Sequence, residues 1–168
     1  MKNKIENALS KLVGKNMVAS GYAGLQWFLF GEKKVVIAHD GKKKENAEYS
    51  LNVSTSWRIR GANGVVTGSQ DYFHPPGDIN EDFDYDSFNP VEEENRTEAA
   101  LKGLFNTGEM HTINRISGDE CGSLFISFES GYVLEVIPMD SVDQEHWRFF
   151  AYESSEAHFV ITGTGVEE

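Results

Sequence analysis

An acidic run in the middle of the chain carries the residues best suited to binding a metal. Oxygen-bearing side chains alternate there, and Asp78, Asn80 and Asp82 match the first ligands of a twelve-residue calcium-binding loop. The match ends at Phe83, where such loops need glycine, and at Asn89, where they need glutamate. These residues predict a weak divalent-cation site. The alternative, favoured by the mutual repulsion of the carboxylates, is a solvated acidic loop.

Two Trp-Arg pairs are the second group of candidates. Trp57-Arg58 and Trp147-Arg148 lie in stretches that alternate apolar and polar residues, a pattern typical of half-buried strands. Guanidinium groups beside indole rings can stack on a planar ligand. These four residues predict a ligand pocket between the two halves of the chain. In the alternative interpretation, each Trp lies in the core and each Arg is exposed.

The remaining chemistry-bearing residues match no known catalytic pattern. His146 and His158 are spaced to meet in one hairpin and share a metal with a nearby glutamate, although isolated histidines more often end strands. The chain contains no nucleophile elbow, no phosphate-binding loop and no dinucleotide-binding glycine pattern. We therefore identify no catalytic residue, favour a protein that is not an enzyme, and expect no cofactor.

The elements that position these residues follow from apolar periodicity. Apolar residues at 5, 8, 9, 12 and 13 predict an N-terminal helix, and good helix formers at 92–105 predict a second helix. Most other segments are short, β-prone and separated by turn residues, which favours antiparallel strands. Among them, 25–31 and 34–39 are predicted to form a hairpin around Gly31-Glu32.

The β-prone segments occur in the same order twice. The matched segments are 28–30 with 126–128, 51–53 with 134–136, 57–59 with 147–149, and 65–68 with 160–163. We therefore predict an α+β, mostly antiparallel β fold in a single domain, 1–168. Two related four-strand meanders, 15–70 and 107–168, form packed sheets or a barrel, and an acidic insertion with a helix, 71–106, separates them.

The two halves of the chain carry net charges of opposite sign. The net charge of the 168 residues is −12, but residues 1–70 carry nine Lys and two Arg against five acids, whereas residues 71–168 carry four basic residues against 22 acids. This acidity disfavours nucleic acid as a partner and favours a basic protein. The carboxylates expected to bind such a partner are Asp82, Asp84, Asp86, Glu92, Glu93 and Glu94. The alternative is that the acidity serves solubility alone.

The N-terminus and the cysteine content indicate the compartment. The first residues contain no apolar leader segment, and no apolar stretch is long enough to span a membrane. Cys121 is the single cysteine, so an intramolecular disulfide is excluded. We therefore expect a cytoplasmic protein with no membrane partner, whose oligomeric state the sequence does not specify.

Read in order, several strand motifs resemble those of a small uncharacterised family of bacterial proteins, a domain of unknown function. The motifs are LQWF (25–28), YSLNV (49–53), WRI (57–59), EVIP (135–138), HWRFF (146–150) and HFV (158–160). The resemblance covers most of 20–163 and implies a bacterial, cytoplasmic protein, without any assigned reaction or catalytic residue. Small acidic bacterial proteins include immunity proteins that neutralise toxins. The leading hypothesis is therefore a non-enzymatic protein that binds a basic partner, and the alternative is a small-molecule-binding or enzymatic β-barrel.

Overall fold

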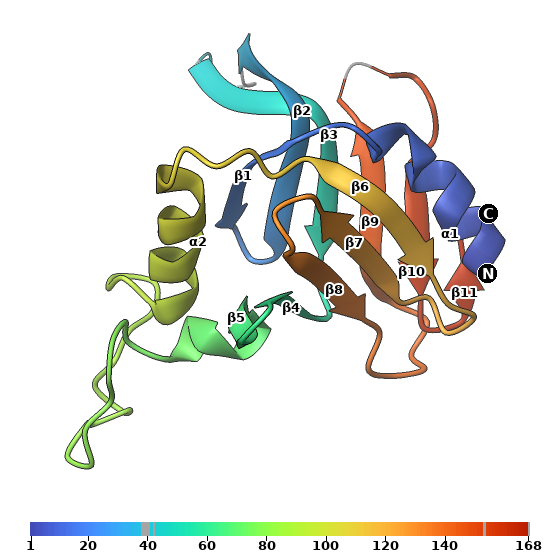
Figure 1. The fold of residues 1–168 in the computed structure, drawn as a ribbon. Helices are drawn as coiled ribbons and strands as arrows, with labels where there is room; N and C mark the ends of the chain where they lie inside the picture. The colour runs from blue at the N-terminus through green and yellow to red at the C-terminus, as the bar shows by residue number, and fades with distance from the viewer. Residues whose placement is uncertain (38–40, 42, 153, 168) are drawn as a thin grey trace.

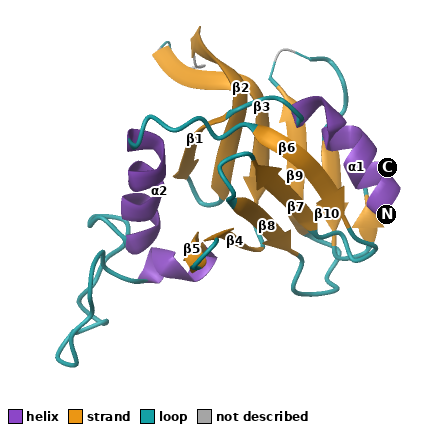
Figure 2. Ribbon diagram, in the orientation of Figure 1, coloured by secondary structure: helices purple, strands orange, loops and turns teal. Residues whose placement is uncertain are grey.

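In the computed structural model, which describes residues 1–37, 41, 43–152 and 154–167, two antiparallel sheets pack together and two α-helices flank them (Figures 1 and 2). The helices are α1 (Lys2–Leu9) and α2 (Arg96–Asn106), with short 3₁₀ helices η1 (Ser10–Leu12) and η2 (Ser69–Phe73). The strands are β1 (Met17–Tyr22), β2 (Gln26–Ile37), β3 (Lys43–Val53), β4 (Ser56–Gly61), β5 (Gly64–Gly68), β6 (Ile113–Gly118), β7 (Leu124–Phe128), β8 (Val133–Ile137), β9 (Glu145–Ala151), β10 (Phe159–Thr162) and β11 (Gly165–Val166).

Both sheets are open and antiparallel. One has the strand order β1-β2-β3-β9-β10-β11, and the other has the order β5-β4-β8-β7-β6. The predicted α+β class, its antiparallel strands and its two helices are therefore confirmed. Of the two predicted arrangements, the structure has the packed sheets and not the barrel.

The two halves of the chain exchange strands. In the first sheet, β1, β2 and β3 from the first half continue into β9 and β10 from the second half. In the other sheet, β6, β7 and β8 continue into β4 and β5. Neither half forms a sheet of its own, so each predicted meander is divided between the two layers.

Strand registers relate the two halves by an approximate two-fold axis. Val53 pairs with Trp147 where β3 meets β9, and Val136 pairs with Trp57 where β8 meets β4. The bridge between Asn16 and Thr112 joins equivalent positions, because Met17 pairs with Phe30 in one half as Ile113 pairs with Phe128 in the other. An antiparallel bridge between equivalent residues is itself two-fold symmetric, so the axis passes through it.

Three sequence expectations need correction. The predicted match of 65–68 with 160–163 is out of step by three residues, because Arg58 pairs with Gly68 whereas Arg148 pairs with Val160. The predicted hairpin at Gly31 is wrong: β2 continues through Gly31, whose φ of +89° accommodates a bulge, and residues 38 and 39 lie outside the described residues. The second helix begins at residue 96, because the Asn95 side chain accepts a hydrogen bond from the backbone N–H of Glu98.

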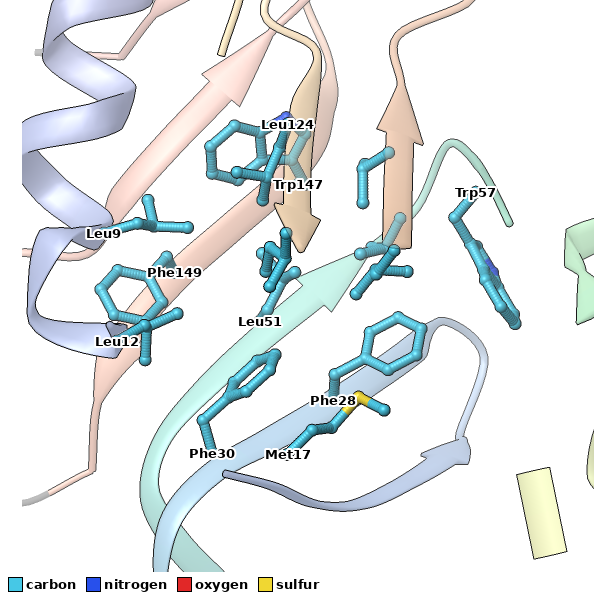
Figure 3. Packing of buried hydrophobic residues seen from close by; sticks show 14 of the residues in the cluster. Leu9, Leu12, Met17, Phe28, Phe30, Leu51, Trp57, Leu124, Trp147 and Phe149 are labelled. Atoms are coloured by element: carbon cyan, nitrogen blue, oxygen red, sulfur yellow. The ribbon is translucent and has the colours of Figure 1, made fainter. Parts of the chain in front are cut away.

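The core lies between the sheets and is closed at each end by a helix. Trp147 is fully buried next to Leu124, whereas Trp57 lies at the edge of the same cluster, beyond Phe28 (Figure 3). The α1 side of the core is closed by Ile5, Leu9 and Leu12, and the α2 side by Leu101 and Leu104. Burial of these side chains holds each helix against the other half of the chain: α1 packs against β6, and α2 packs against the equivalent strand, β1.

Candidate functional site

A pocket of about 380 Å³ opens beside Trp57, and we call it the Trp57 pocket. Its walls come from both halves of the chain: the β1–β2 turn, the β3–β4 connection, η2, the start of α2, and the segment leading into β9. The volume lies within the range of small-molecule sites. The lining residues are Tyr22, Gly24, Leu25, Gln26, Val53, Ser54, Thr55, Ser56, Trp57, Ser69, Gln70, Tyr72, Phe73, Thr97, Met139, Asp140 and His146.

Exposed aromatic side chains form one rim of the Trp57 pocket. The ring centroids of Tyr22 and Tyr72 lie 4.4 Å apart, and those of Tyr72 and Phe73 lie 5.3 Å apart. Phe73 is 57% exposed and Tyr22 is 46% exposed, which is unusual for such large apolar rings. Aromatic faces open to solvent at a pocket mouth offer stacking surface to a ligand.

Two ring nitrogens of the pocket wall lack a partner. His146 is 4% exposed, and its Nε2 is buried without a hydrogen bond, with the nearest carboxylate oxygen, Asp140 Oδ1, 3.6 Å away. Within the described part of the chain, no atom accepts a hydrogen bond from Trp57 Nε1. A buried polar atom without a partner costs about 1–3 kcal/mol. A ligand that hydrogen-bonds to His146 Nε2 would recover that energy, whereas Trp57 Nε1 is not among the buried atoms without a partner and offers a donor at the pocket wall.

The equivalent place in the other half is filled by the protein itself. There, Trp147 Nε1 donates a 2.9 Å hydrogen bond to the carbonyl oxygen of Gly122. A Cβ atom built on Gly122 would lie 2.8 Å from Ile161 Cγ2, 3.2 Å from Met1 Sδ and 3.5 Å from Pro138 Cγ. Gly24 occupies the corresponding position beside Trp57, and a Cβ atom built there meets no atom within 4 Å. The two equivalent sites therefore differ. Side chains fill the site beside Trp147, whereas the site beside Trp57 is an open pocket.

Substitutions at equivalent positions explain this difference. Counting on from the last equivalent pairs matches Ser69, one residue after Gly68, to Ile161, one residue after Val160. It matches Thr55, two residues after Val53, to Pro138, two residues after Val136. The spacing from the Asn16–Thr112 bridge places Thr97 where the other half has Met1. Three small hydroxyl residues thus replace three apolar residues that fill the Trp147 site. The pocket exists because side-chain volume is missing from three separate elements.

Of the four residues predicted to line a pocket, the structure brings only Trp57 to the Trp57 pocket. Trp147 is in the core, and Arg148 lines a separate depression, where its guanidinium pairs with Glu145. Arg58 is on the outer face of β4, where it pairs with Glu135. The sequence does not single out the hydroxyl residues Thr55, Ser69 and Thr97, or His146, as pocket residues. The signal that identifies the hydroxyl residues is their difference from the apolar residues at equivalent positions of the second half.

Glu135 is held by two arginines of the neighbouring strand. Its side chain is 7% exposed and accepts hydrogen bonds from Arg58 Nε at 2.5 Å and Arg60 Nε at 2.6 Å. Burial alone would raise the pKa of Glu135, but the hydrogen bonds from Arg60 and Arg58 outweigh it and hold the pKa below its usual value.

We expect Glu135→Gln to lower the free energy of unfolding by about 1–2 kcal/mol at pH 7, because two charge-assisted hydrogen bonds are lost. A depressed carboxyl pKa gives stability that is present above the unfolded-state pKa of about 4.3 and is lost as pH falls through the folded-state pKa. Urea denaturation at several pH values should therefore show the difference between the two proteins shrinking below about pH 4. A difference that is constant from pH 7 to pH 3 would contradict this assignment.

The acidic insertion projects from the body beside α2 and η2 (Figure 1). Within it, Asn80 Oδ1 accepts a hydrogen bond from the backbone N–H of Asp82, which forms a local turn. The described residues contain no group of three His, Cys, Asp or Glu side chains arranged to hold a metal ion. The site at Asp78, Asn80 and Asp82 stays a prediction.

The aromatic residues of the insertion pack on one another. Phe83 contacts Tyr85 and Phe88, with ring centroids 4.9 Å and 6.0 Å apart, and His74 contacts Tyr85 at 5.6 Å. The main core does not include these rings. Arg96 donates to the carbonyl oxygens of Pro75 and Gly77 and so ties the insertion to the start of α2.

Part of the charge difference between the halves is neutralised inside the molecule. The N-terminal amino group of Met1 pairs with Glu120 at 2.7 Å, and Lys11 pairs with Glu156 at 3.3 Å. Arg58 and Arg60 pair with Glu135 in the same way. Of the six carboxylates predicted to bind a partner, Glu94 pairs with Lys102 at 2.6 Å, and the other five form no ion pair with a described residue. Glu94 is thus neutralised within the molecule, whereas no described cation neutralises the other five.

His146 and His158 do not share a site. The His158 ring stacks on Phe150, with ring centroids 4.4 Å apart, and lies near the Arg148 guanidinium, whereas His146 faces the Trp57 pocket.

Among the described residues, no helix is both long and apolar enough to cross a membrane. Comparison of the chain with protein-family models, with curated proteins and with solved structures found no match.

Proposed function

We propose that this protein binds a small ligand, or a single side chain of a partner, in the Trp57 pocket. The observation that carries this proposal is the difference between the two equivalent sites: the Trp147 site satisfies its indole N–H and fills its space, whereas the Trp57 site does neither. A hollow beside the core and the buried, unpartnered Nε2 of His146 both cost stability in the folded state. A bound ligand offsets both costs.

Nitrogen-15 NMR of the tryptophan indoles tests the proposal. The chain has three tryptophans, and Trp→Phe variants assign their N–H signals. The signals are followed while small polar compounds of positive, zero and negative charge are added. We expect at least one class to shift the Trp57 signal at saturation and to leave the Trp147 signal in place. A panel in which no compound shifts Trp57, or in which every shift affects both signals equally, would overturn the proposal.

A second candidate function is electrostatic capture of a basic protein by the insertion, as a toxin-neutralising immunity protein would do. It is supported by the five insertion carboxylates that form no ion pair with a described residue and by the projection of the segment from the body. Such a surface accelerates association in a salt-dependent way.

Polylysine is a suitable probe of the insertion. We expect the Asp82→Asn, Asp84→Asn, Asp86→Asn triple variant to lower its association rate about tenfold at low salt. Glu109→Gln, outside the insertion, is the matched control. Rates that are equal in the triple variant and the wild type would exclude the insertion as the binding surface.

A further inference from the structure

We propose that the ligand of the Trp57 pocket carries an organic cation, an ammonium or guanidinium group, which lies between Asp140, His146 and the aromatic rim. This inference names the ligand class of the site proposed above and rests on that proposal. Its first support is the composition of the walls. No Lys or Arg is among the described residues that line the pocket, whereas a carboxylate is.

The arginines that neighbour the lining residues Trp57 and Thr97 in the sequence are engaged elsewhere. Arg58 and Arg60 pair with Glu135 on the outer face of the sheet, and Arg96 donates to carbonyl oxygens of the insertion. An anion in the pocket would therefore meet Asp140 with no compensating cation. A positively charged group would meet no such repulsion.

Asp140 is positioned to accept a hydrogen bond from the ligand. The backbone N–H of Val142 donates to Asp140 Oδ1 at 2.9 Å, which orients the carboxylate at the pocket mouth. His146 Nε2, 3.6 Å from the same oxygen, is buried and without a partner. An ammonium group has three donors, enough for the carboxylate and for a ring nitrogen that accepts, and a guanidinium has five.

The aromatic rim favours the same class of ligand. A cation over the face of Tyr, Trp or Phe is attracted by the ring electrons, and exposed rings at the mouth leave such faces open. Burial raises the pKa of the Tyr72 phenol, and nearby Tyr22 and Glu98 raise it further, so the ring stays neutral at physiological pH. Tyr72 and Phe73 on η2 and Tyr22, whose ring contacts Tyr72, thus form an aromatic rim in a pocket that also holds one carboxylate.

A matched pair of probes tests the charge requirement. Nα-acetyl-lysine amide carries an ammonium, and its norleucine counterpart has nearly the same shape without the charged group. Titration followed by the Trp57 indole signal should give an affinity about tenfold higher for the charged probe. Asp140→Asn should remove most of that preference and leave the affinity for the neutral probe unchanged. Asp143→Asn, whose carboxylate accepts from Thr164 outside the Trp57 pocket, is the matched control and should have no effect.

The outcomes separate the two proposals. Equal binding of both probes, each shifting the Trp57 signal, would overturn the cation inference and leave the binding function standing. If neither these probes nor any compound of the wider panel shifts the Trp57 signal, the binding function itself fails. A preference that survives in Asp140→Asn but disappears in Asp82→Asn would place the cation at the acidic insertion and overturn the inference.

The same titration distinguishes a free amine from a side chain of a protein. A glycine-rich pentapeptide with lysine at its centre presents the ammonium as a protein would. An affinity for this peptide that equals or exceeds that for the free probe identifies a basic side chain as the source. Binding of the free probe alone identifies a small amine.

Discussion

Replacing Trp147 by alanine should lower the free energy of unfolding by about 3–5 kcal/mol, the largest stability effect we expect from one substitution. The ring is fully buried between the sheets, and its Nε1 donates to the carbonyl oxygen of Gly122. Its removal leaves a cavity, and that carbonyl loses its partner. Both losses act in the folded state, so denaturation by guanidinium chloride should show a lower midpoint.

The equivalent substitution Trp57→Ala is the matched comparison. Trp57 is 5% exposed and packs edge-on against Phe28, with ring centroids 5.2 Å apart, but it lines a hollow and its N–H lacks a described partner. We expect its loss to cost about 1–2 kcal/mol less than the loss of Trp147, because fewer contacts and no hydrogen bond are removed. Equal costs at the two positions would contradict the difference between the two sites.

Ser69→Ile should close the Trp57 pocket and reduce ligand affinity by more than about tenfold. Ser69 begins η2 at the position that corresponds by count to Ile161, and both Ser69 and Gly24 line the pocket, so we expect the new side chain to occupy the space near Gly24. Because the space beside Gly24 is open, the larger side chain should enter it without displacing a neighbour. We therefore expect a free energy of unfolding that is unchanged or higher.

The control for Ser69→Ile adds the same atoms elsewhere. Ser127 lies on the outer face of β7, between the inward-facing Ile126 and Phe128. Ser127→Ile should leave the indole signals and the ligand affinity unchanged. If calorimetry shows that Ser69→Ile binds a ligand of the pocket as tightly as the wild type does, the ligand does not occupy the space that the substitution fills.

The sequence predicts the elements of this fold better than their pairing. Alternation of apolar residues is a local property, so it identifies β4 and β9 around Trp57 and Trp147. It does not specify which strand lies next to them. The sequence therefore does not predict that β4 joins the sheet of β6, β7 and β8 and that β9 joins the sheet of β1, β2 and β3. β1 was also missed, because Met17–Tyr22 contains small residues and little alternation. Gly31 suggested a turn, since a bulge and a turn both require a positive φ.

The candidate site was harder to predict because a pocket is a property of missing volume. Thr55, Ser69 and Thr97 come from three elements and form no motif. Their role is visible only when the two halves are superposed by their strand pairings, which matches them to Pro138, Ile161 and Met1. The sequence does predict Trp57 as a pocket residue, because a tryptophan in an alternating strand is a candidate both for the core and for a pocket wall.

Solvent exchange of the indole N–H protons in the ligand-free protein tests most directly the claim that one of two equivalent sites is open. Trp147 donates to Gly122 inside a filled site, so its N–H should exchange only when the core opens. Trp57 borders the pocket, so its N–H should exchange at least about a hundredfold faster under the same conditions. Similar exchange rates for Trp57 and Trp147 would contradict the account, because they would mean that both sites are closed or that both are open.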